Sequence, residues 1–270
     1  NIKDFKVAYI GEEEPEGNYL EFYKILGIGE EQLIHIEKPA RFQKVFVPEA
    51  GFRPCIWYTE EYQRMFDQMT ESVLKDKTLK ENFKNIKKIY FSRRKFGKAA
   101  ATEFGEEYIE QCFNQNGYES LGPETLTLRE QIYVWNHAEA IACMNGTIPL
   151  NVVFCKNEEL KLTILNKMSI YHKNPYIYLY MRNIQAEFID IYKEPLKGYP
   201  KSLGEGPYLI KEGKEFFDYC QREKFEIPYT GMKLKFYDLK QEIRYYLCVI
   251  GIRNKIRRVG LYIKRKMLRR

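Results

Sequence analysis

Short apolar runs alternate with helical patterns through the middle of the chain, around the segment Lys88–Lys156. Each of three runs has the length of a buried strand and precedes a stretch with the three- and four-residue apolar spacing of a helix. The runs are Ile86–Phe91, Tyr118–Leu121 and Ala138–Met144. Strands that alternate with helices favour a parallel sheet with helices on both faces. The carboxyl ends of such strands share one edge of the sheet, where ligands bind.

The helices of this segment follow the strands in order. The first is predicted over Glu103–Asn114. The second begins at Thr127, whose hydroxyl caps the backbone while Glu130 reaches back to the same turn. A third helix containing Asn151 is expected after the third run.

The flanking segments extend the same pattern. Before the central segment we predict three strands, a helix and a long amphipathic connecting helix; they are Phe5–Ile10, Leu33–Ile36, Lys44–Val47, Tyr19–Leu26 and Tyr58–Leu79. After it we predict two strands and three helices; they are Leu160–Leu165, Glu187–Tyr192, Pro175–Arg182, Glu212–Arg222 and Asp238–Arg270. Proline and glycine recur between residues 195 and 207, which indicates a loop.

Composition favours a globular protein. The 270 residues are 44% hydrophobic and 15% aromatic, which is enough for a packed core. No apolar run reaches the roughly 18 residues of a membrane-spanning helix. Six scattered cysteines without a C-x-x-C pair favour free thiols in a reducing compartment. The three histidines match no zinc spacing, so we expect no metal.

Two turns at predicted strand ends carry candidate chemistry. Ser92-Arg93-Arg94 follows the first run, and guanidinium groups suit phosphate oxygens. Lys95 and Lys98 add positive charge, although spacing alone supports a surface salt-bridge pair equally well. Asn145-Gly146-Thr147 follows the third run, where N–H groups at a helix start bind anions. An isolated turn of this kind is more often only a cap.

A third candidate lies between these turns in sequence. The loop Gly122-Pro123-Glu124-Thr125 ends the middle strand, and a carboxylate at this place accepts hydrogen bonds from ribose in nucleotide-binding α/β folds. Taken alone, Glu124 is more often simply exposed.

Four strings in order carry a resemblance to a known family. The four strings are IYFSRRK, ATE at a helix start, GYESLGPETLTLREQI and ACMNGTIPLNVVF. Through them the chain resembles glycosyltransferase family 61, in particular its bacterial members of capsular or surface polysaccharide synthesis. The agreement covers Lys88–Lys156. It implies a GT-B-like α/β fold, in which two Rossmann-like domains face a cleft. It also implies metal-independent transfer of a sugar from a nucleotide sugar, with inversion.

The long helix predicted over Tyr58–Leu79 places a boundary near residue 80, and the resemblance gives the expected roles of the parts. Residues 1–80 would form an acceptor-side α/β portion with the connecting helix, short for a complete domain. Residues 81–210 would bind the nucleotide sugar, and residues 211–270 would form C-terminal helices with a long basic tail.

Pattern and resemblance together assign nucleotide-sugar binding to nine residues. They are Arg93, Arg94, Lys98, Glu124, Gln131, Asn145, Gly146, Thr147 and Asn151. Many eukaryotic members carry histidine where Asn145 stands, so no imidazole acts at this position.

In the implied reaction an acceptor hydroxyl attacks the anomeric carbon as the nucleoside diphosphate leaves. Arg93, Arg94 and the turn at Gly146 would meet the charge of the diphosphate. Glu13 and His35 are candidates for the base that deprotonates the acceptor. We expect no cofactor, with a nucleotide sugar and a glycan or lipid-linked acceptor as partners.

The formal net charge of +7 belongs to the C-terminal tail, where residues 251–270 contain nine Lys or Arg and no acidic residue. Apolar residues recur there at helical spacing, flanked by Arg253, Arg257, Lys264, Arg265 and Arg269. This pattern suits an anionic membrane surface, while core packing of the stripe and nucleic-acid binding by the charge are the alternatives.

We therefore predict a cytoplasmic bacterial glycosyltransferase of capsular or surface polysaccharide synthesis. It would lie on the inner face of the plasma membrane and bind no nucleic acid. The alternatives are a nucleic-acid-binding protein that uses the basic tail and a noncatalytic scaffold with the same fold.

Overall fold

The computed structural model describes residues 4–11, 14–193, 206–249 and 251. The predicted membrane residues Arg253, Arg257, Lys264, Arg265 and Arg269 lie outside this part of the chain. Glu13 and most of the predicted loop 195–207 lie outside it as well.

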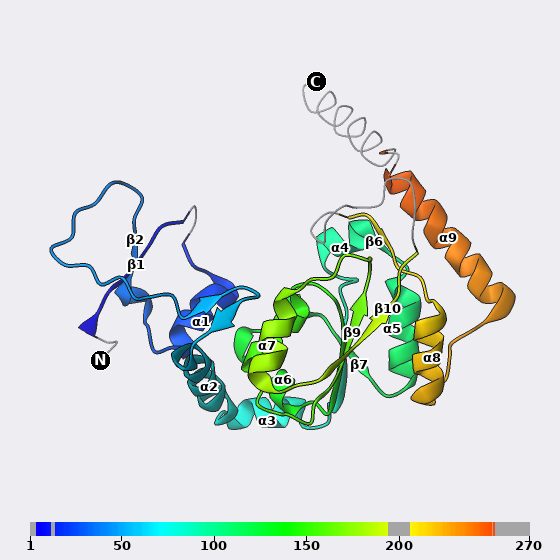
Figure 1. Ribbon diagram of the computed structural model, residues 1–270, viewed down its shortest axis with the longest axis horizontal. Helices are drawn as coiled ribbons and strands as arrows, with labels where there is room; N and C mark the ends of the chain where they lie inside the picture. Colours follow the sequence, from blue (N-terminus) through cyan, green and yellow to red (C-terminus); the bar gives the residue numbers. More distant parts are fainter. Residues whose placement is uncertain (1–3, 12–13, 194–205, 250, 252–270) are drawn as a thin grey trace, which may run out of the picture.

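A five-stranded parallel sheet occupies the centre of the molecule (Figure 1). Its strands are β5 (Lys88–Phe91), β7 (Glu119–Leu121), β8 (Ala140–Met144), β9 (Lys161–Asn166) and β10 (Ala186–Asp190). They lie in the order β10-β9-β8-β5-β7, and every neighbouring pair is parallel. The mixed α/β fold with a parallel sheet, predicted from the alternation of strands and helices, is confirmed.

Helices cover both faces of this sheet. One face packs against α2 (Glu60–Leu74), α3 (Lys77–Phe83), α6 (Leu128–His137), the 3₁₀ helix η4 (Ile148–Phe154) and α7 (Asn174–Arg182). The other packs against α5 (Glu106–Gln115), α8 (Lys214–Arg222) and α9 (Gly231–Val249). The period-two alternation of a strand explains the two cores. On β5, Phe91 stacks on Trp135 of α6, whereas Tyr90 stacks on Phe113 of α5.

Local capping decides where several helices begin. Thr127 and Glu130 form the predicted capping box, with the Thr127 hydroxyl accepting from the Glu130 N–H at 3.2 Å. The prediction of one helix over Tyr58–Leu79 is wrong, because the chain breaks between α2 and α3. The Asp76 carboxylate accepts a hydrogen bond from the Thr78 N–H at 2.9 Å and so starts a new helix.

The helix predicted from Glu103 begins three residues later. Residues 103–104 follow the short helix α4 (Gly97–Thr102) and form strand β6 (Glu103–Phe104) instead. Strand β6 pairs with β11 (Tyr208–Leu209). Gly105 then has a φ of 106°, and a Cβ there would lie 2.0 Å from the Ile210 carbonyl oxygen. Only glycine fits this left-handed turn, which aims α5 away from β6.

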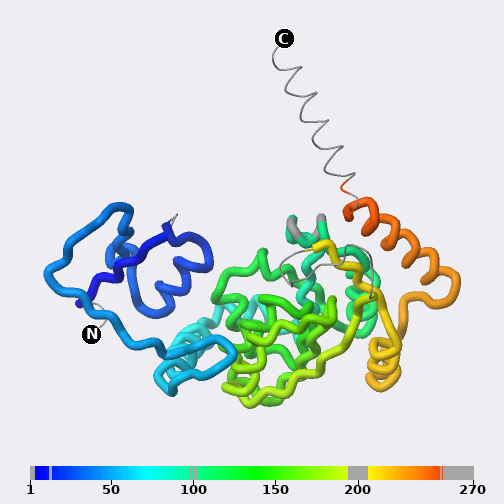
Figure 2. The backbone as a smooth tube through the Cα atoms, turned by 45° about the horizontal axis from the view of Figure 1, so that its top comes forward, coloured from blue at the N-terminus to red at the C-terminus, as the bar shows by residue number. Residues whose placement is uncertain are grey.

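The N-terminal portion forms a lobe beside the sheet (Figures 1 and 2). It contains β1 (Val7–Tyr9), α1 (Gly17–Ile25), the 3₁₀ helix η2 (Glu30–Gln32), β2 (Leu33–His35), β3 (Phe52–Arg53) and β4 (Trp57–Tyr58). Strands β1 and β2 form one parallel pair, and β3 and β4 one antiparallel pair. A second Rossmann-like domain, and with it the GT-B-like arrangement, stays a prediction.

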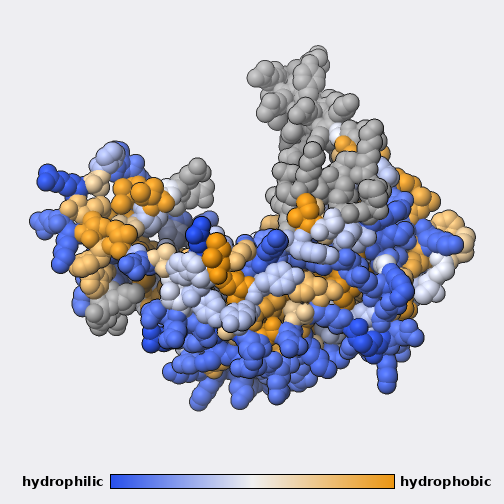
Figure 3. Space-filling model, in the orientation of Figure 1, coloured by the Kyte–Doolittle hydropathy of each residue, from blue (hydrophilic) through white to orange (hydrophobic). Residues whose placement is uncertain are grey.

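The strand predicted over Lys44–Val47 is wrong. These residues lie in a long loop between Ile36 and Ala50 with exposed side chains, and Pro48, which has no N–H, follows directly. In the space-filling view, orange side chains gather on this lobe, and a hollow separates it from the body that carries the sheet (Figure 3).

The two predicted domain boundaries stay predictions. The first, at residue 80, lies inside α3, whose Leu79 and Phe83 belong to the same core as α2 and α6.

The final helix, predicted over Asp238–Arg270, differs from the prediction at its start. Helix α9 (Gly231–Val249) begins seven residues before the predicted start, whereas the predicted end at Arg270 lies outside the described residues. Among the described residues, no helix is long and apolar enough to span a membrane.

Candidate functional site

The order of the strands locates the ligand edge of the sheet. From β5 the chain first adds β7 on one side and then returns to add β8, β9 and β10 on the other. The direction of addition therefore reverses between β5 and β8. In open α/β sheets ligands bind beyond the carboxyl ends of the strands at this switch point.

A cavity of about 390 Å³ lies at this place. Its walls come from the loops after β5, β8 and β9 and from the β6–β11 pair; the lining residues are Arg93, Phe96, Thr102, Glu103, Gly146, Thr147, Lys167, His172, Gly206 and Tyr208. Three of the nine predicted binding residues, Arg93, Gly146 and Thr147, thus line one cavity although they are separated by about fifty positions in sequence.

Three charged side chains form a buried cluster in the cavity wall. The Glu103 carboxylate oxygen Oε1 lies 2.7 Å from Lys167 Nζ and 3.3 Å from Arg93 Nε. The side chains of Lys167 and Glu103 are only 4% and 3% exposed. Burial lowers the pKa of Lys167, while Glu103 opposes that shift. The cluster carries one net positive charge.

Aromatic rings hold the two cations of this cluster. Lys167 Nζ lies 4.3 Å from the centre of the Tyr208 ring, and the Arg93 guanidinium lies 5.6 Å from that of Phe96. Such contacts favour a cation electrostatically and restrict its rotamers. The cluster therefore presents positive charge to the cavity in a defined position.

Glu106 fixes the backbone of the arginine turn. Its Oε1 accepts hydrogen bonds from the Arg93 N–H at 2.9 Å and from the Tyr90 hydroxyl at 3.2 Å. Burial raises the pKa of Glu106 to about 7, although the hydrogen bond from Arg93 acts in the opposite direction.

Stability is expected to fall between about pH 4.5 and pH 7 because of Glu106. The folded protein holds this proton up to about pH 7, whereas the unfolded carboxyl releases it near its ordinary pKa of 4.5. Glu106→Gln keeps an acceptor for Arg93 and Tyr90, so it should raise the free energy of unfolding at pH 8 by roughly 2 kcal/mol. Urea denaturation between pH 5 and 8 measures this, with Glu107→Gln as the exposed neighbouring control. Equal pH profiles for Glu106→Gln and the wild type would contradict the assignment.

The turn after β8 is open to the cavity. A Cβ built on Gly146 meets no atom within 4 Å, so a ligand can approach the backbone there. Asn145 is buried below it and donates a hydrogen bond to Asn166 Oδ1 at 2.8 Å, while Asn166 donates to Asp190 at 2.8 Å. This amide chain ties the ends of β8, β9 and β10 together, so Asn145 shapes the turn from beneath.

Arg94 points away from the cavity. Its guanidinium lies 2.6 Å from Glu110 and 3.3 Å from Glu107, both on α5. It lines a different hollow, of about 250 Å³, between α5 and α9. The structure therefore separates the two arginines that the sequence placed in one site. Lys98 belongs to α4, and its side chain is not among those described.

Glu124, Gln131 and Asn151 gather around the loop after β7, outside the cavity lining. Gln131 accepts a hydrogen bond from Asn151 at 2.7 Å and donates to the carbonyls of Pro123 and Leu126 at 3.1 and 3.2 Å. Glu124 is exposed on the 3₁₀ turn η3 (Pro123–Thr125). In this structure Gln131 and Asn151 hold the loop to α6 and η4.

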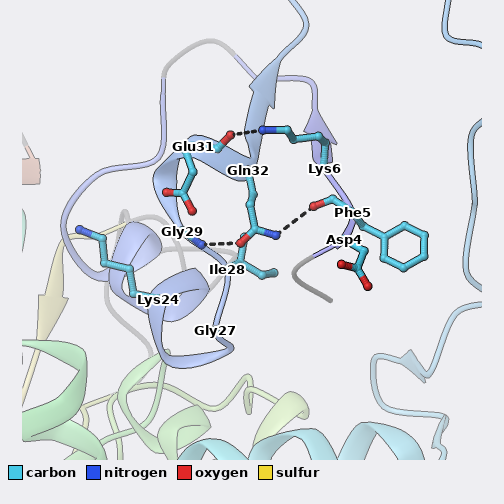
Figure 4. A pocket seen from close by; sticks show the side chains of 9 residues that line it. All are labelled: Asp4, Phe5, Lys6, Lys24, Gly27, Ile28, Gly29, Glu31 and Gln32. Atoms are coloured by element: carbon cyan, nitrogen blue, oxygen red, sulfur yellow. Dashed lines mark hydrogen bonds between the residues drawn. The ribbon is translucent and has the colours of Figure 1, made fainter. Parts of the chain in front are cut away.

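His35 belongs to the N-terminal lobe. Its ring stacks on Tyr9 with centres 4.9 Å apart, and its Nε2 donates to the Gly11 carbonyl at 2.9 Å. The lobe also has a cavity of about 620 Å³ between the start of β1, α1 and η2 (Figure 4). Gln32 crosses it, donating to the Phe5 carbonyl at 2.9 Å and accepting from the Gly29 N–H at 3.0 Å, so this amide joins the segments (Figure 4).

Seven of the ten lining residues were not assigned to the site by the sequence analysis, and Lys167 and His172 are two of them. Lys167 directly follows the apolar run that ends β9, so the strand-end argument applied to Arg93 also points to Lys167. His172 lies five residues further, and burial lowers the pKa of this imidazole. No group of three or more His, Cys, Asp or Glu suited to a metal ion occurs in the described part of the chain.

Comparisons with known proteins connect this geometry to a family. Comparison with curated proteins gives no match. The family model described as Glycosyltransferase 61 matches residues 31–162. This match runs from η2 into β9 and includes Arg93, Gly146 and Thr147. Residues 31–162 thus match the model of glycosyltransferase family 61, and this match supports a glycosyltransferase.

Proposed function

We propose that the protein transfers a sugar from a nucleotide sugar whose diphosphate binds in the cavity between β5 and β8. The observation that carries this proposal is the convergence of Arg93, Lys167 and the open Gly146–Thr147 turn at the switch point of a parallel sheet. Each component suits a phosphate oxygen: a forked guanidinium, a point charge and an accessible backbone.

The charges on the cavity wall suit the leaving group. As the acceptor oxygen forms its bond to the anomeric carbon, the bond from that carbon to the diphosphate breaks. The electron pair then stays on the diphosphate oxygen. Fixed cations that face this oxygen stabilise the transition state more than the ground state. Glu103 holds both cations in place before the donor arrives.

This charge arrangement supports a reaction without a divalent ion, in which Arg93 and Lys167 take the part that a metal plays elsewhere. Inversion at the anomeric carbon, a glycan or lipid-linked acceptor and a role in bacterial capsular or surface polysaccharide synthesis belong to the same proposal. They follow from the resemblance of residues 88–156. The proton acceptor for the acceptor hydroxyl would come from the N-terminal lobe, where Glu13 and His35 are the candidates.

A ligand screen in the presence of EDTA tests this function. Uridine, guanosine, thymidine and adenosine diphosphates and their sugar conjugates are added to the full chain, and thermal unfolding is followed. One class should raise the melting temperature with and without EDTA, since a ligand at a hundredfold excess over its Kd stabilises a fold by about 2.7 kcal/mol. The conjugate that binds is then tested for release of its diphosphate.

Two results would count against the proposal. The absence of a shift with every nucleotide would remove the nucleotide site. A shift that EDTA abolishes would remove the metal-independent mechanism while keeping the site.

A further inference from the structure

Helix α9 presents an apolar stripe to solvent along its whole length. Every member is between 38% and 65% exposed; they are Met232, Phe236, Leu239, Ile243, Tyr246 and Leu247. Steps of three and four residues place them on one side of the helix. In the space-filling view, orange side chains follow the outer side of α9 at the right of the molecule (Figure 3).

The opposite side of α9 is fully used by the fold. Leu234 and Tyr245 are buried there, and Tyr237 donates a hydrogen bond to the Gly105 carbonyl at 3.0 Å. The acidic residues of the helix also turn inward, because Asp238 pairs with Lys211 at 3.0 Å and Glu242 with Lys193. The outer stripe is therefore not needed to attach α9 to the sheet.

Basic residues border the stripe on both sides. Lys233 and Lys240 lie along one border and Lys235 along the other, and all three are exposed. Since Asp238 and Glu242 are paired, the outer side of α9 combines apolar side chains with unopposed positive charge. An anionic lipid surface matches both features, because acyl chains accept the apolar residues and headgroups accept the cations.

We propose that the outer side of α9 lies on an anionic membrane surface. The sequence after this helix agrees in charge, with nine basic and no acidic residues over positions 251–270. A nucleic acid would use the charge but leave the six apolar side chains in water. A second copy of the chain would bury the apolar stripe but oppose equal charges across a symmetric contact.

Membrane binding through α9 has a consequence for the cavity. Tyr245 of α9 packs against Phe104 and Leu209, and the residues before these two, Glu103 and Tyr208, line the cavity. A lipid surface beneath α9 therefore lies next to the wall of the cavity. This position suits an acceptor that is itself anchored in the membrane.

Vesicle flotation of the full chain tests the proposal, without nucleotide or sugar in the assay. Vesicles of phosphatidylcholine alone are compared with vesicles that also contain phosphatidylglycerol. The test variant is Phe236→Asp/Ile243→Asp. The control is Tyr180→Asp, because Tyr180 is 80% exposed on α7, which packs on the opposite face of the sheet from α9. The wild type and the control should bind anionic vesicles, whereas the α9 variant should bind at least tenfold less.

Three outcomes would overturn the proposal. The wild type fails to bind, or the α9 variant binds as the wild type does, or light scattering shows a dimer that only the α9 substitutions dissociate. In the second case, loss of binding on deletion of residues 251–270 would assign membrane binding to the tail alone. Failure of the nucleotide screen changes none of these results, so the two proposals are tested separately.

A milder substitution covers the case in which the aspartates disturb folding. Phe236→Trp places a fluorophore on the stripe at a position that is 65% exposed, with Tyr180→Trp as its control. Brominated anionic lipids should quench the emission that the Phe236→Trp substitution adds and leave that of the control unchanged. Equal quenching of both variants would contradict contact through α9.

Discussion

Replacement of Arg93 by alanine is expected to lower sugar transfer by about 100-fold or more, the usual effect of losing one fixed donor to a developing anion. Nucleotide affinity should fall by roughly 10-fold or more, because one charge-assisted hydrogen bond to the diphosphate is lost. Arg93 is the guanidinium of the cavity wall, held by Glu103 and Phe96. Calorimetry with the nucleotide found in the screen measures the affinity, and release of diphosphate measures transfer. Arg93→Lys should restore part of the affinity but not the bidentate contact.

The neighbouring residue provides a matched control for this substitution. Arg94→Ala removes the same chemical group one position away, but Arg94 pairs with Glu107 and Glu110 on α5 and lines another hollow. It should leave nucleotide affinity within about twofold and lower the melting temperature, because Glu110 loses its cation in a partly buried place. Equal loss of binding in both variants would show that the cavity between β5 and β8 is not the diphosphate site.

Lys167→Met is expected to cost about 3–5 kcal/mol of folding free energy, because it leaves the buried Glu103 carboxylate with a weaker partner. Arg93 still lies 3.3 Å from Glu103, which places the loss toward the lower end of this range. Urea denaturation at pH 7 measures the change. Transfer should be lost together with stability, since the cavity loses a cation.

A double variant separates the two roles of Lys167. Lys167→Met/Glu103→Gln removes both charges of the closest pair, so stability should recover to within about 1.5 kcal/mol of the wild type. Nucleotide affinity should stay low, because the cation that faces the diphosphate is still missing. Recovered affinity in the double variant would make Lys167 a purely structural partner of Glu103.

The strands and most helices of the central segment could be predicted because each rests on a local signal. The runs that form β5, β8 and β9 are mostly apolar and almost entirely buried, as expected for strands covered on both faces. The capping box at Thr127 likewise lies within four residues. The errors came where a helix cap or a left-handed turn interrupted a good apolar pattern. Asp76 divides the helix predicted over Tyr58–Leu79, and Gly105 delays α5.

The candidate site was predictable in part for the same reason. A strand-end argument led to Arg93 and to the turn at Gly146, and the structure places both in one cavity. That argument could not tell Arg93 from Arg94. Consecutive side chains leave the backbone in different directions, and the distant carboxylates of α5 decide that Arg94 pairs there.

The sequence by itself determined the α/β class, the parallel sheet and the similarity of residues 31–162 to glycosyltransferase family 61, because these depend on the order and spacing of residues along the chain. Only the tertiary structure decided which polar residues share the site. Lys167 faces Arg93 across Glu103 because β9 lies beside β8 and the β6–β11 pair closes the cavity. Such neighbours are set by the lateral order of strands and by pairing between segments about one hundred residues apart, which no local pattern encodes.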